Sequence, residues 1–465
     1  MRYLFTIAFL FGLATTCRCW VIIIPWEYPT IQEGIDASQN GDTILVMPGI
    51  YHEFVRYSGK DILLCSSFGP ESTFVSQVIF SGGTDSSAIL RGFSLYGTGD
   101  NGSSVEIEGG SSGSIEGNRM SMNSTFGMGG GIYSIGNNVI IRENIISNNR
   151  ALERGGGINI SGVGFLISDN IIEGNIAGGD DESWGGGGMY VDGSDFIIKY
   201  NLIANNQAGD PPWPPVIGGG GAQIWTGYGG GRTKISNNTF VGNKCLYLTE
   251  NAGSGLWISS GDTVRIINNI FAYNYQGGVW TDVTPYYILD YNLAWDNDYG
   301  DYGGFEPGPN CLFVDPLFVN PWGGNYHLQP NSPCIDAGDP NSLLDPDSTR
   351  ADIGCYFYDH STDILETDNP SGPHKFYLKQ NYPNPFNGET IISYYLPQDA
   401  FVELNIINMR GELVAKPVNS RQSSGNHTLT WPGTRSDGTP VSTGIYFYEL
   451  KVGPHRDIKA MILLK

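Results

Sequence analysis

At 465 residues the chain is long enough for two or three domains, and 47 acidic against 25 basic residues give a formal net charge of −22 at pH 7. Nucleic acids and anionic membranes bind clustered lysine and arginine, so this balance argues against both as partners. The 65 glycines and a charged fraction of only 15% are typical of a protein of strands and turns rather than helices.

The N-terminus has the features of a secretory signal peptide. Arg2 precedes an apolar run over residues 4–14 that is too short to span a membrane as a mature anchor, and small and polar residues follow. We therefore expect residues 1–19 to be a signal peptide and the protein to be exported. No later apolar stretch approaches the length of a transmembrane helix, so we expect no spanning segment in the mature chain.

Residues 25–53 contain the pattern of a short amphipathic helix. Thr30 and Glu33 have the spacing of a capping box, while Ile31 and Ile35 place two apolar side chains on one face. Because the end of a repeat protein exposes its core, a helix of this kind can cover it. We expect this segment to be an N-terminal cap.

An asparagine pair with the spacing Asn-x4-Asn then recurs seven times between residues 118 and 297. Successive first asparagines lie 26, 26, 31, 37, 31 and 23 residues apart. A fixed core with variable gaps indicates one structural unit per repeat, joined by loops of different lengths. The pairs are Asn118/Asn123, Asn144/Asn149, Asn170/Asn175, Asn201/Asn206, Asn238/Asn243, Asn269/Asn274 and Asn292/Asn297.

Each repeat reads as three glycines, a short strand, a turn, a second strand, Asn, a third strand and Asn. Apolar residues recur three positions before and two positions after the first Asn, an alternation of period two that is broken by a bend. We therefore expect three short strands per coil, stacked into three parallel sheets around one apolar core. Since asparagine tolerates left-handed backbone and bonds nearby main chain, we expect the asparagines to turn the chain and form a ladder of amides.

These repeats resemble the right-handed parallel β-helix family, the architecture of pectin lyases and of many non-catalytic relatives, over about residues 20–358. The resemblance implies an all-β fold in which a parallel β-helix solenoid precedes the C-terminal segment. The segment 311-CLFVDPLFVNPWGGNYHLQPNSPCIDAGDP-340 with Asp352-Ile353-Gly354 resembles the closing region of secreted β-helix proteins of the choice-of-anchor Q type. This second resemblance implies a C-terminal cap over about residues 311–358.

One residue per repeat, the second after the last glycine, has apolar neighbours on both sides and is therefore expected to point outward. Its flat or amide side chains would lie about 4.8 Å apart, near the rise of a sugar unit in an extended glycan. We expect this row to bind an extracellular polysaccharide by stacking and hydrogen bonding. The alternative is that the stacking only stabilises the sheet. The row consists of Tyr133, Asn159, Tyr190, Gln223, Trp257 and Trp280.

The alternative function is a polysaccharide lyase that acts on uronic-acid glycans. Elimination needs an arginine or lysine as base, usually with Ca²⁺. A hydrolase fits less well, because no histidine lies between residues 53 and 326. No complete catalytic set is visible, so the sequence favours a non-catalytic binding protein with Ca²⁺ as the one cofactor to consider. The candidate bases are Lys199 and Arg142, and the candidate metal ligands are Asp180, Asp181, Glu182, Asp192 and Asp195.

Export permits disulfide bonds. A bridge among Cys311, Cys334 and Cys355 and buried free thiols at these positions are both open from the sequence alone.

Residues 359–375 are polar and lack periodicity, which indicates a linker. Alternating apolar residues and turn signals then predict a small β-sandwich over residues 376–465. The predicted strands span residues 390–396, 401–407, 427–431, 444–450 and 458–464.

The segments 380-QNYPNPFNGETIISYYLP-397, 404-LNIINMRGELV-414 and 444-GIYFYELKVG-453 closely resemble the C-terminal sorting domain of type IX secretion, which has an FlgD-like immunoglobulin fold. The resemblance implies recognition by the type IX secretion machinery. It also implies export across a Gram-negative outer membrane, followed by surface attachment or release. A generic adhesive sandwich is the alternative.

Overall fold

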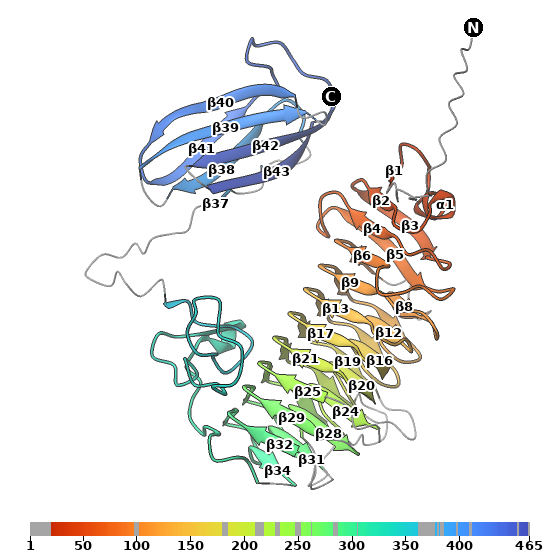
Figure 1. Ribbon diagram of the computed structural model, residues 1–465, viewed down its shortest axis with the longest axis vertical. Coiled ribbons are helices and arrows are strands. Elements are labelled where there is room, and N and C mark those ends of the chain that lie inside the picture. The colour runs from red at the N-terminus through yellow and green to blue at the C-terminus, as the bar shows by residue number, and fades with distance from the viewer. Residues whose placement is uncertain are drawn as a thin grey trace, which may run out of the picture. The chain divides into compact units, whose positions relative to one another are not determined.

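The computed structural model divides into two compact units, residues 1–358 and residues 359–465, which are described separately (Figure 1). Among the described residues no helix is long and apolar enough to cross a membrane. The structure describes residues 20–96, 102–178, 185–209, 218–227, 233–246, 253–261, 263–281, 287–304, 306–360, 377–378, 381, 386–396, 399–408, 412–452 and 455–463.

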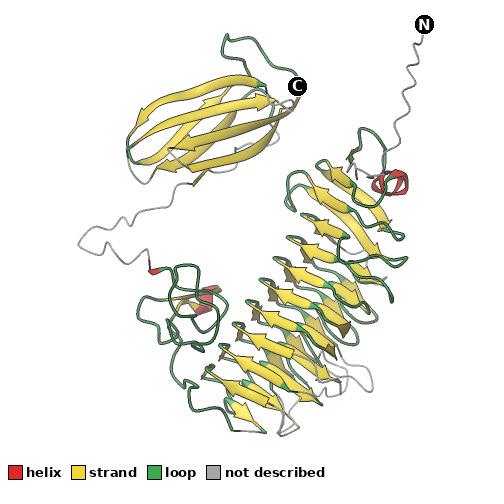
Figure 2. Ribbon diagram, in the orientation of Figure 1, coloured by secondary structure: helices red, strands yellow, loops and turns green. Residues whose placement is uncertain are grey.

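The first unit is a parallel β-helix in which a complete coil carries four short strands. In one coil these are β16 (Ile158–Val163), β17 (Leu166–Ser168), β18 (Ile171–Glu173) and β19 (Ile176–Ala177). Equivalent strands of successive coils pair in parallel and in register. The result is the three predicted faces plus a narrow fourth sheet of two-residue strands, visible as the stacked arrows of Figure 2.

Each face is formed by the strands that occupy the same position in successive coils. The long strand β5 belongs to the first face and also joins it to the third, because β5 pairs with both β8 and β7. The first face contains β3 (Gly49–Arg56), β5 (Thr73–Phe80), β8 (Val105–Ile107), β12 (Ile132–Ser134), β16, β20 (Met189–Ser194), β24 (Ala222–Thr226), β28 (Leu256–Ser260), β31 (Val279–Thr281) and β34 (Tyr302–Gly303). The second face contains β1 (Val21–Ile24), β2 (Thr43–Val46), β4 (Leu63–Ser66), β6 (Ile89–Arg91), β9 (Ser114–Glu116), β13 (Ile140–Arg142), β17, β21 (Ile197–Lys199), β25 (Thr233–Ser236), β29 (Val264–Ile267) and β32 (Tyr287–Asp290).

The third face contains β7 (Ser94–Leu95), β10 (Arg119–Ser121), β14 (Ile145–Ser147), β18, β22 (Leu202–Ala204), β26 (Thr239–Val241), β30 (Ile270–Ala272) and β33 (Leu293–Trp295). The narrow sheet contains β11 (Ser124–Thr125), β15 (Arg150–Ala151), β19, β23 (Gln207–Ala208) and β27 (Lys244–Cys245).

The predicted inward positions form the core of the solenoid. Burial of this much apolar side chain is the main force that holds the coils together. The residues three before each first Asn are Ile115, Ile141, Ile167, Ile198, Ile235, Ile266 and Leu289, and the residues two after it are Met120, Ile146, Ile172, Ile203, Phe240, Phe271 and Ala294; all are buried.

Both asparagine columns form the predicted ladders. Asn175 shows the pattern, because its backbone N–H and its Nδ2 both donate to Oδ1 of Asn206, at 3.0 Å each. Its own Oδ1 accepts from the backbone N–H and the Nδ2 of Asn149 at 3.0 and 2.9 Å, while Nδ2 also donates to the carbonyl of Ile146 at 2.9 Å. The asparagines therefore satisfy buried backbone groups at the corners of the coils.

The left-handed residue at each bend is not the asparagine, as the sequence suggested, but the residue before it. Asp169, Tyr200 and Asn237, which precede first asparagines, have φ of 59°, 55° and 54°. Since the asparagine amide is fixed in the ladder, the turn takes its positive φ one position earlier. Gly174 and Gly242 occupy the same place before second asparagines, at φ of 66° and 64°.

The glycine triplets form a corner where successive coils approach closely. A methyl group added at Gly157 would lie 2.6 Å from the carbonyl oxygen of Gly188 and 3.0 Å from the side-chain carbon of Asn175. Only glycine leaves room there for both the neighbouring coil and the ladder.

The N-terminal end carries the predicted helix, α1 (Ile31–Ala37). The Thr30 hydroxyl accepts from the backbone N–H of Glu33 at 3.2 Å, and Ile31 and Ile35 are fully buried in the solenoid core. Glu53 of β3 accepts from the N–H of Ile31 at 3.0 Å, so an acidic side chain from the next element completes the N-cap.

The closing segment, residues 311–358, begins at the end of the solenoid and then leaves it. Leu312 adds one bridge to β33, Cys311 joins the solenoid core, and Phe313 packs edge-on against Tyr302 of β34, so the start of the closing segment continues the end of the β-helix. The chain then forms β35 (Phe318–Asn320), the 3-10 helix η1 (Pro321–Gly323) and β36 (Asn325–Leu328), and loops back along the third face (Figure 1).

The cause of this placement is the apolar outer surface of the third face. Leu202, Ile270 and Leu293 point away from the solenoid core and pack against Phe318 and Ile353 of the closing segment. Polar contacts fix the same arrangement. The Asn237 side chain donates to the carbonyl of Asp352 at 3.0 Å.

Of the two alternatives for cysteine, the structure contains free thiols at Cys311, Cys334 and Cys355. Burial raises the pKa of the Cys334 and Cys355 thiols to about 12, so both stay protonated.

The second unit is a sandwich of two antiparallel sheets around a separate apolar core. One sheet contains β37 (Tyr377–Leu378), β38 (Thr390–Leu396) and β41 (Gly425–Trp431), and the other contains β40 (Leu413–Gln422), β39 (Ala400–Asn408), β42 (Gly444–Val452) and β43 (His455–Leu463). The sequence missed β37 and β40. The latter is an edge strand, where Pro417 lacks an N–H without breaking a central ladder.

Candidate functional site

The predicted row on the first face exists as a line of register partners. Tyr133 pairs with Asn159, Asn159 with Tyr190, and Tyr190 with Gln223. Gln223 pairs with Trp257, and Trp257 pairs with Trp280. These side chains lie outside the solenoid core, whose members are their neighbours along each strand.

The row is nevertheless not an open binding surface, and this corrects the sequence-based expectation. The exposed fraction is 2% for Asn159, 6% for Tyr190, 0% for Gln223 and 2% for Trp257. Gly218 lies directly over Gln223, since an added methyl group there would meet the Gln223 Oε1 at 2.0 Å. Four of the six side chains therefore cannot reach a sugar in this structure.

The contacts within the row stabilise the sheet. Trp257 and Trp280 stack with their ring centroids 5.7 Å apart and an interplanar angle of 11°. The guanidinium of Arg154 lies 5.1 Å from the ring centroid of Tyr190 and donates to its hydroxyl at 3.3 Å. Only Tyr133 and Trp280, near the two ends, keep partial exposure.

The candidate bases lie on the second face. Arg142 is engaged by Glu116, with an Nη2–Oε1 distance of 2.9 Å. Lys199 lies 5.5 Å above the ring of Tyr200. Burial, followed by the positive charge of Arg265 and then of Lys199, lowers the pKa of the neighbouring Lys234.

The structure describes two of the five candidate metal ligands, Asp192 and Asp195. Asp192 belongs to β20 of the first face, and Asp195 occupies the following turn with φ of 57°. Asp180, Asp181 and Glu182 lie outside the described residues. Within the part of the chain that the structure describes, no three His, Cys, Asp or Glu side chains gather as a metal site.

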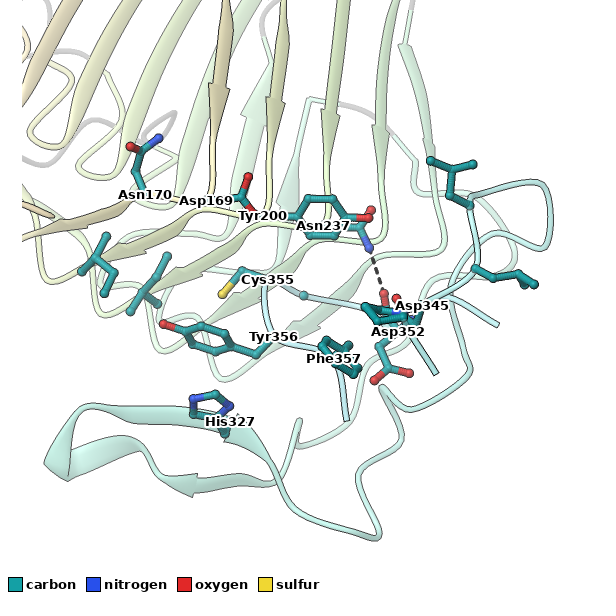
Figure 3. A pocket seen from close by; sticks show the side chains of 16 residues that line it. Asp169, Asn170, Tyr200, Asn237, His327, Asp345, Asp352, Cys355, Tyr356 and Phe357 are labelled. Carbon is teal, nitrogen blue, oxygen red and sulfur yellow. Dashed lines mark hydrogen bonds between the residues drawn. The ribbon is translucent and has the colours of Figure 1, made fainter. Parts of the chain in front are cut away.

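Two cavities lie where the closing segment meets the third face. The first, of about 630 Å³, is shown in Figure 3, and we call it the Asp352 pocket. Both carboxylate oxygens of Asp352 accept backbone N–H groups, from Asp336 and Tyr358 at 2.6 Å each. Because its central acid is committed to holding the closing segment, this pocket is part of the fold.

The second cavity, which we call the aromatic cleft, has a volume of about 610 Å³. Its floor follows the left-handed corner positions of successive coils, and η1 forms its opposite wall. It is lined by Glu173, Asn205, Val241, Gly242, Tyr273, Tyr275, Asp296, Asp298, Pro321, Trp322, Gly323, Gly324 and Tyr326.

Two aromatic side chains of this cleft are highly exposed, whereas Tyr326 is buried. Trp322 is 87% exposed and Tyr275 is 57% exposed. The rings of Trp322 and Tyr273 lie 5.7 Å apart at 43°, so they present two flat surfaces to one space. Gly242 lies between Asn205 and Tyr273 in the corner row and leaves the floor open. Apolar faces of this kind suit the C–H faces of sugars.

Polar groups accompany the aromatic rings. The Asn205 amide donates to Glu173 at 3.3 Å, whereas the exposed carboxylates of Asp296 and Asp298 form no hydrogen bond or ion pair among the described residues. Burial, followed by the charges of Asp315 and Asp296, raises the pKa of Tyr273 to about 12, so its phenol remains neutral.

The sequence contains a signal for this site that the repeat pattern hides. In β22 and β30 the outward residues Leu202, Ala204, Ile270 and Ala272 are as apolar as the inward ones. A strand that is apolar on both sides is buried on both sides, which indicates that another segment covers the third face. Where that segment ends, a cleft forms.

Comparison with protein families supports the fold of both units. Residues 77–251 match a model described as a right handed beta helix region. Residues 380–453 match one described as an FlgD Ig-like domain. The chain is therefore a right-handed parallel β-helix followed by an immunoglobulin-like sandwich.

Solved structures and curated proteins add no functional assignment. Pectate lyase Pel9A aligns at 14% identity over 73% of this chain and 96% of that chain, with a TM-score of 0.33. PorZ, an essential bacterial surface component of the type-IX secretion system of Porphyromonas gingivalis, aligns at 18% identity over 20% of this chain, with a TM-score of 0.15; the match spans only 12% of PorZ. No curated protein matches this chain.

Proposed function

We propose that this protein is an exported, non-catalytic polysaccharide-binding protein and that the aromatic cleft is its binding site. The carrying observation is the exposure of Trp322 and Tyr275 beside Asp296 and Asp298 in one cavity. Accessible rings supply stacking surfaces, and carboxylates without protein partners can accept hydrogen bonds from sugar hydroxyls. The cleft takes over the role that the sequence assigned to the row from Tyr133 to Trp280.

The test is affinity electrophoresis of the purified protein through gels that contain a panel of neutral, acidic and amino-sugar polysaccharides. We expect Trp322→Ala to weaken binding of the retained glycan about 30-fold, since loss of a central aromatic contact costs about 2 kcal/mol. Trp280→Ala is the matched control and should leave the affinity unchanged. Equal binding by the Trp322→Ala variant and the parent would place the glycan elsewhere.

The same panel separates binding from cleavage. A lyase would convert uronic-acid glycans to unsaturated products that absorb in the ultraviolet, with or without added Ca²⁺. We expect no such product. An absorbing product whose formation is abolished by Lys199→Ala would replace the binding function by lyase activity.

We further propose that the immunoglobulin-like unit directs the protein to the cell surface, or to secretion, through the type IX machinery. The motifs of residues 380–397 and 444–453 carry this proposal. Deletion of residues 376–465 should leave the protein in the periplasm of a type IX-competent host. Recovery of the truncated protein at the surface or in the medium would contradict the proposal.

A further inference from the structure

The charges of the aromatic cleft are of one sign. Glu173, Asp296 and Asp298 line it, and the charge of Asp315 acts on Tyr273. Among the described residues that line the cleft there is no lysine or arginine. Lys244 occupies the position of Tyr275 one coil earlier and is not one of the lining side chains. An anionic sugar would therefore meet like charges without a compensating cation.

The two exposed carboxylates flank one residue of the asparagine ladder and line the same cleft. Asp296 precedes and Asp298 follows Asn297, whose side chain is fixed at the end of the ladder by Asp301 at 2.7 Å. Asn297 thus anchors the backbone between Asp296 and Asp298, and both acids line the same cleft as Trp322. Since neither acid forms an ion pair with a described lysine or arginine, a positive charge on a ligand can fill this role.

We infer, on the basis of the proposed function, that the natural ligand is a polysaccharide with free amino groups. These amino groups are protonated when the ligand binds. The ammonium groups would pair with Asp296, Asp298 and Glu173, while the rings of Trp322 and Tyr273 stack on the sugar faces and attract the same cations. The cleft would reject polyuronates, the substrates expected of the alternative lyase function.

A matched ligand pair isolates the charge. Glucosamine oligomers and their N-acetylated counterparts share a backbone and differ in the ammonium group, and oligogalacturonate supplies the opposite sign. By calorimetry at about pH 5.5, where exposed carboxylates are mostly ionised, we expect the glucosamine oligomer to bind at least tenfold more tightly than its acetylated form. Oligogalacturonate should not bind. Raising the ionic strength to about 1 M, which shortens the screening length to about 3 Å, should remove the preference.

Variants locate the effect. Glu173→Gln with Asp296→Asn and Asp298→Asn should abolish the preference for the glucosamine oligomer over its acetylated form, because the amides carry no charge. Asp298→Asn alone should weaken glucosamine binding severalfold, whereas Asp192→Asn, an equal loss of charge at an exposed aspartate on the first face, should not.

The failures of the two proposals are distinguishable. If the acetylated oligomer or oligogalacturonate binds as tightly as the glucosamine oligomer and Trp322→Ala still weakens binding, the ligand class is wrong and the binding site stands. If none of the three binds in a Trp322-dependent manner, the proposed function itself fails.

Discussion

At the scale of single residues, the ladder asparagines combine several tasks. Asn175 bonds the coil on either side through its amide, and it supplies the acceptor for the backbone N–H of Asn149. These groups are fully buried, and an unpaired buried donor costs about 1–3 kcal/mol. The spacing of the asparagines predicted the ladder correctly, whereas the left-handed position beside them depends on how the amide is used, which no spacing reveals.

We expect Asn175→Ala to lower the free energy of unfolding by about 3 kcal/mol, because it removes the acceptor of the Asn149 N–H and Nδ2 and the donor to the buried carbonyl of Ile146. Urea denaturation followed by circular dichroism measures this loss. Asn40→Ala, at an exposed asparagine that bonds only Asp61, serves as the control and should change stability by less than about 1 kcal/mol. Equal losses of unfolding free energy in the two variants would show that the ladder hydrogen bonds contribute no more stability than an exposed side-chain pair.

Asp352 gives the closing segment a pH dependence of its own. Burial, with the charges of Asp345 and Asp336 added, raises its pKa from 3.8 to about 6. The folded chain thus binds this proton more tightly than the unfolded chain, so the group stabilises the fold at low pH and loses that contribution as the pH rises from about 4 through 6.

We therefore expect the stability of the parent relative to Asp352→Asn to be greater at pH 4 than at pH 7. Unfolding measured at both pH values for both proteins checks this, since all other titrating groups are common to the pair. A difference that stays constant, or that grows with pH, would contradict the raised pKa.

At the scale of elements, the glycine corner and the third face are the places where the sequence pattern did not predict the packing. In-and-out alternation correctly placed the core residues of every described coil. It did not reveal that Gly218 covers Gln223 or that residues 318–358 fold back over Leu202 and Ile270, because both depend on contacts between segments distant in the sequence. The edge strand β40 was missed for a local reason. Its polar residues and Pro417 do not alternate like those of the buried strands.

We expect Gly157→Ala to destabilise the β-helix by about 1–3 kcal/mol, because the methyl group would be forced against the next coil and the ladder. Thermal unfolding measures the effect. Gly227→Ala provides a control in which an added methyl group meets no atom within 4 Å. If Gly157→Ala unfolds at the same temperature as the control, the coils do not approach as closely as the structure indicates.

At the scale of the whole molecule, the fold class and the two-unit organisation were accessible from the sequence, but the site was not. Repeats and strand patterns report local periodicity, and a cleft between a solenoid face and a returning segment has no period. The aromatic residues that the repeat singles out are those that became buried, whereas Trp322 lies in the irregular closing segment. An acidic chain with an acidic cleft is consistent with a cationic glycan as partner.

The most direct test of glycan binding in the aromatic cleft is a crystal structure of the protein with a bound glucosamine oligomer. We predict sugar rings stacked on Trp322 and Tyr273, with amino groups within hydrogen-bond distance of Asp296 or Asp298. Sugar density along the row from Tyr133 to Trp280, or an empty cleft in crystals saturated with a ligand that binds in solution, would contradict it.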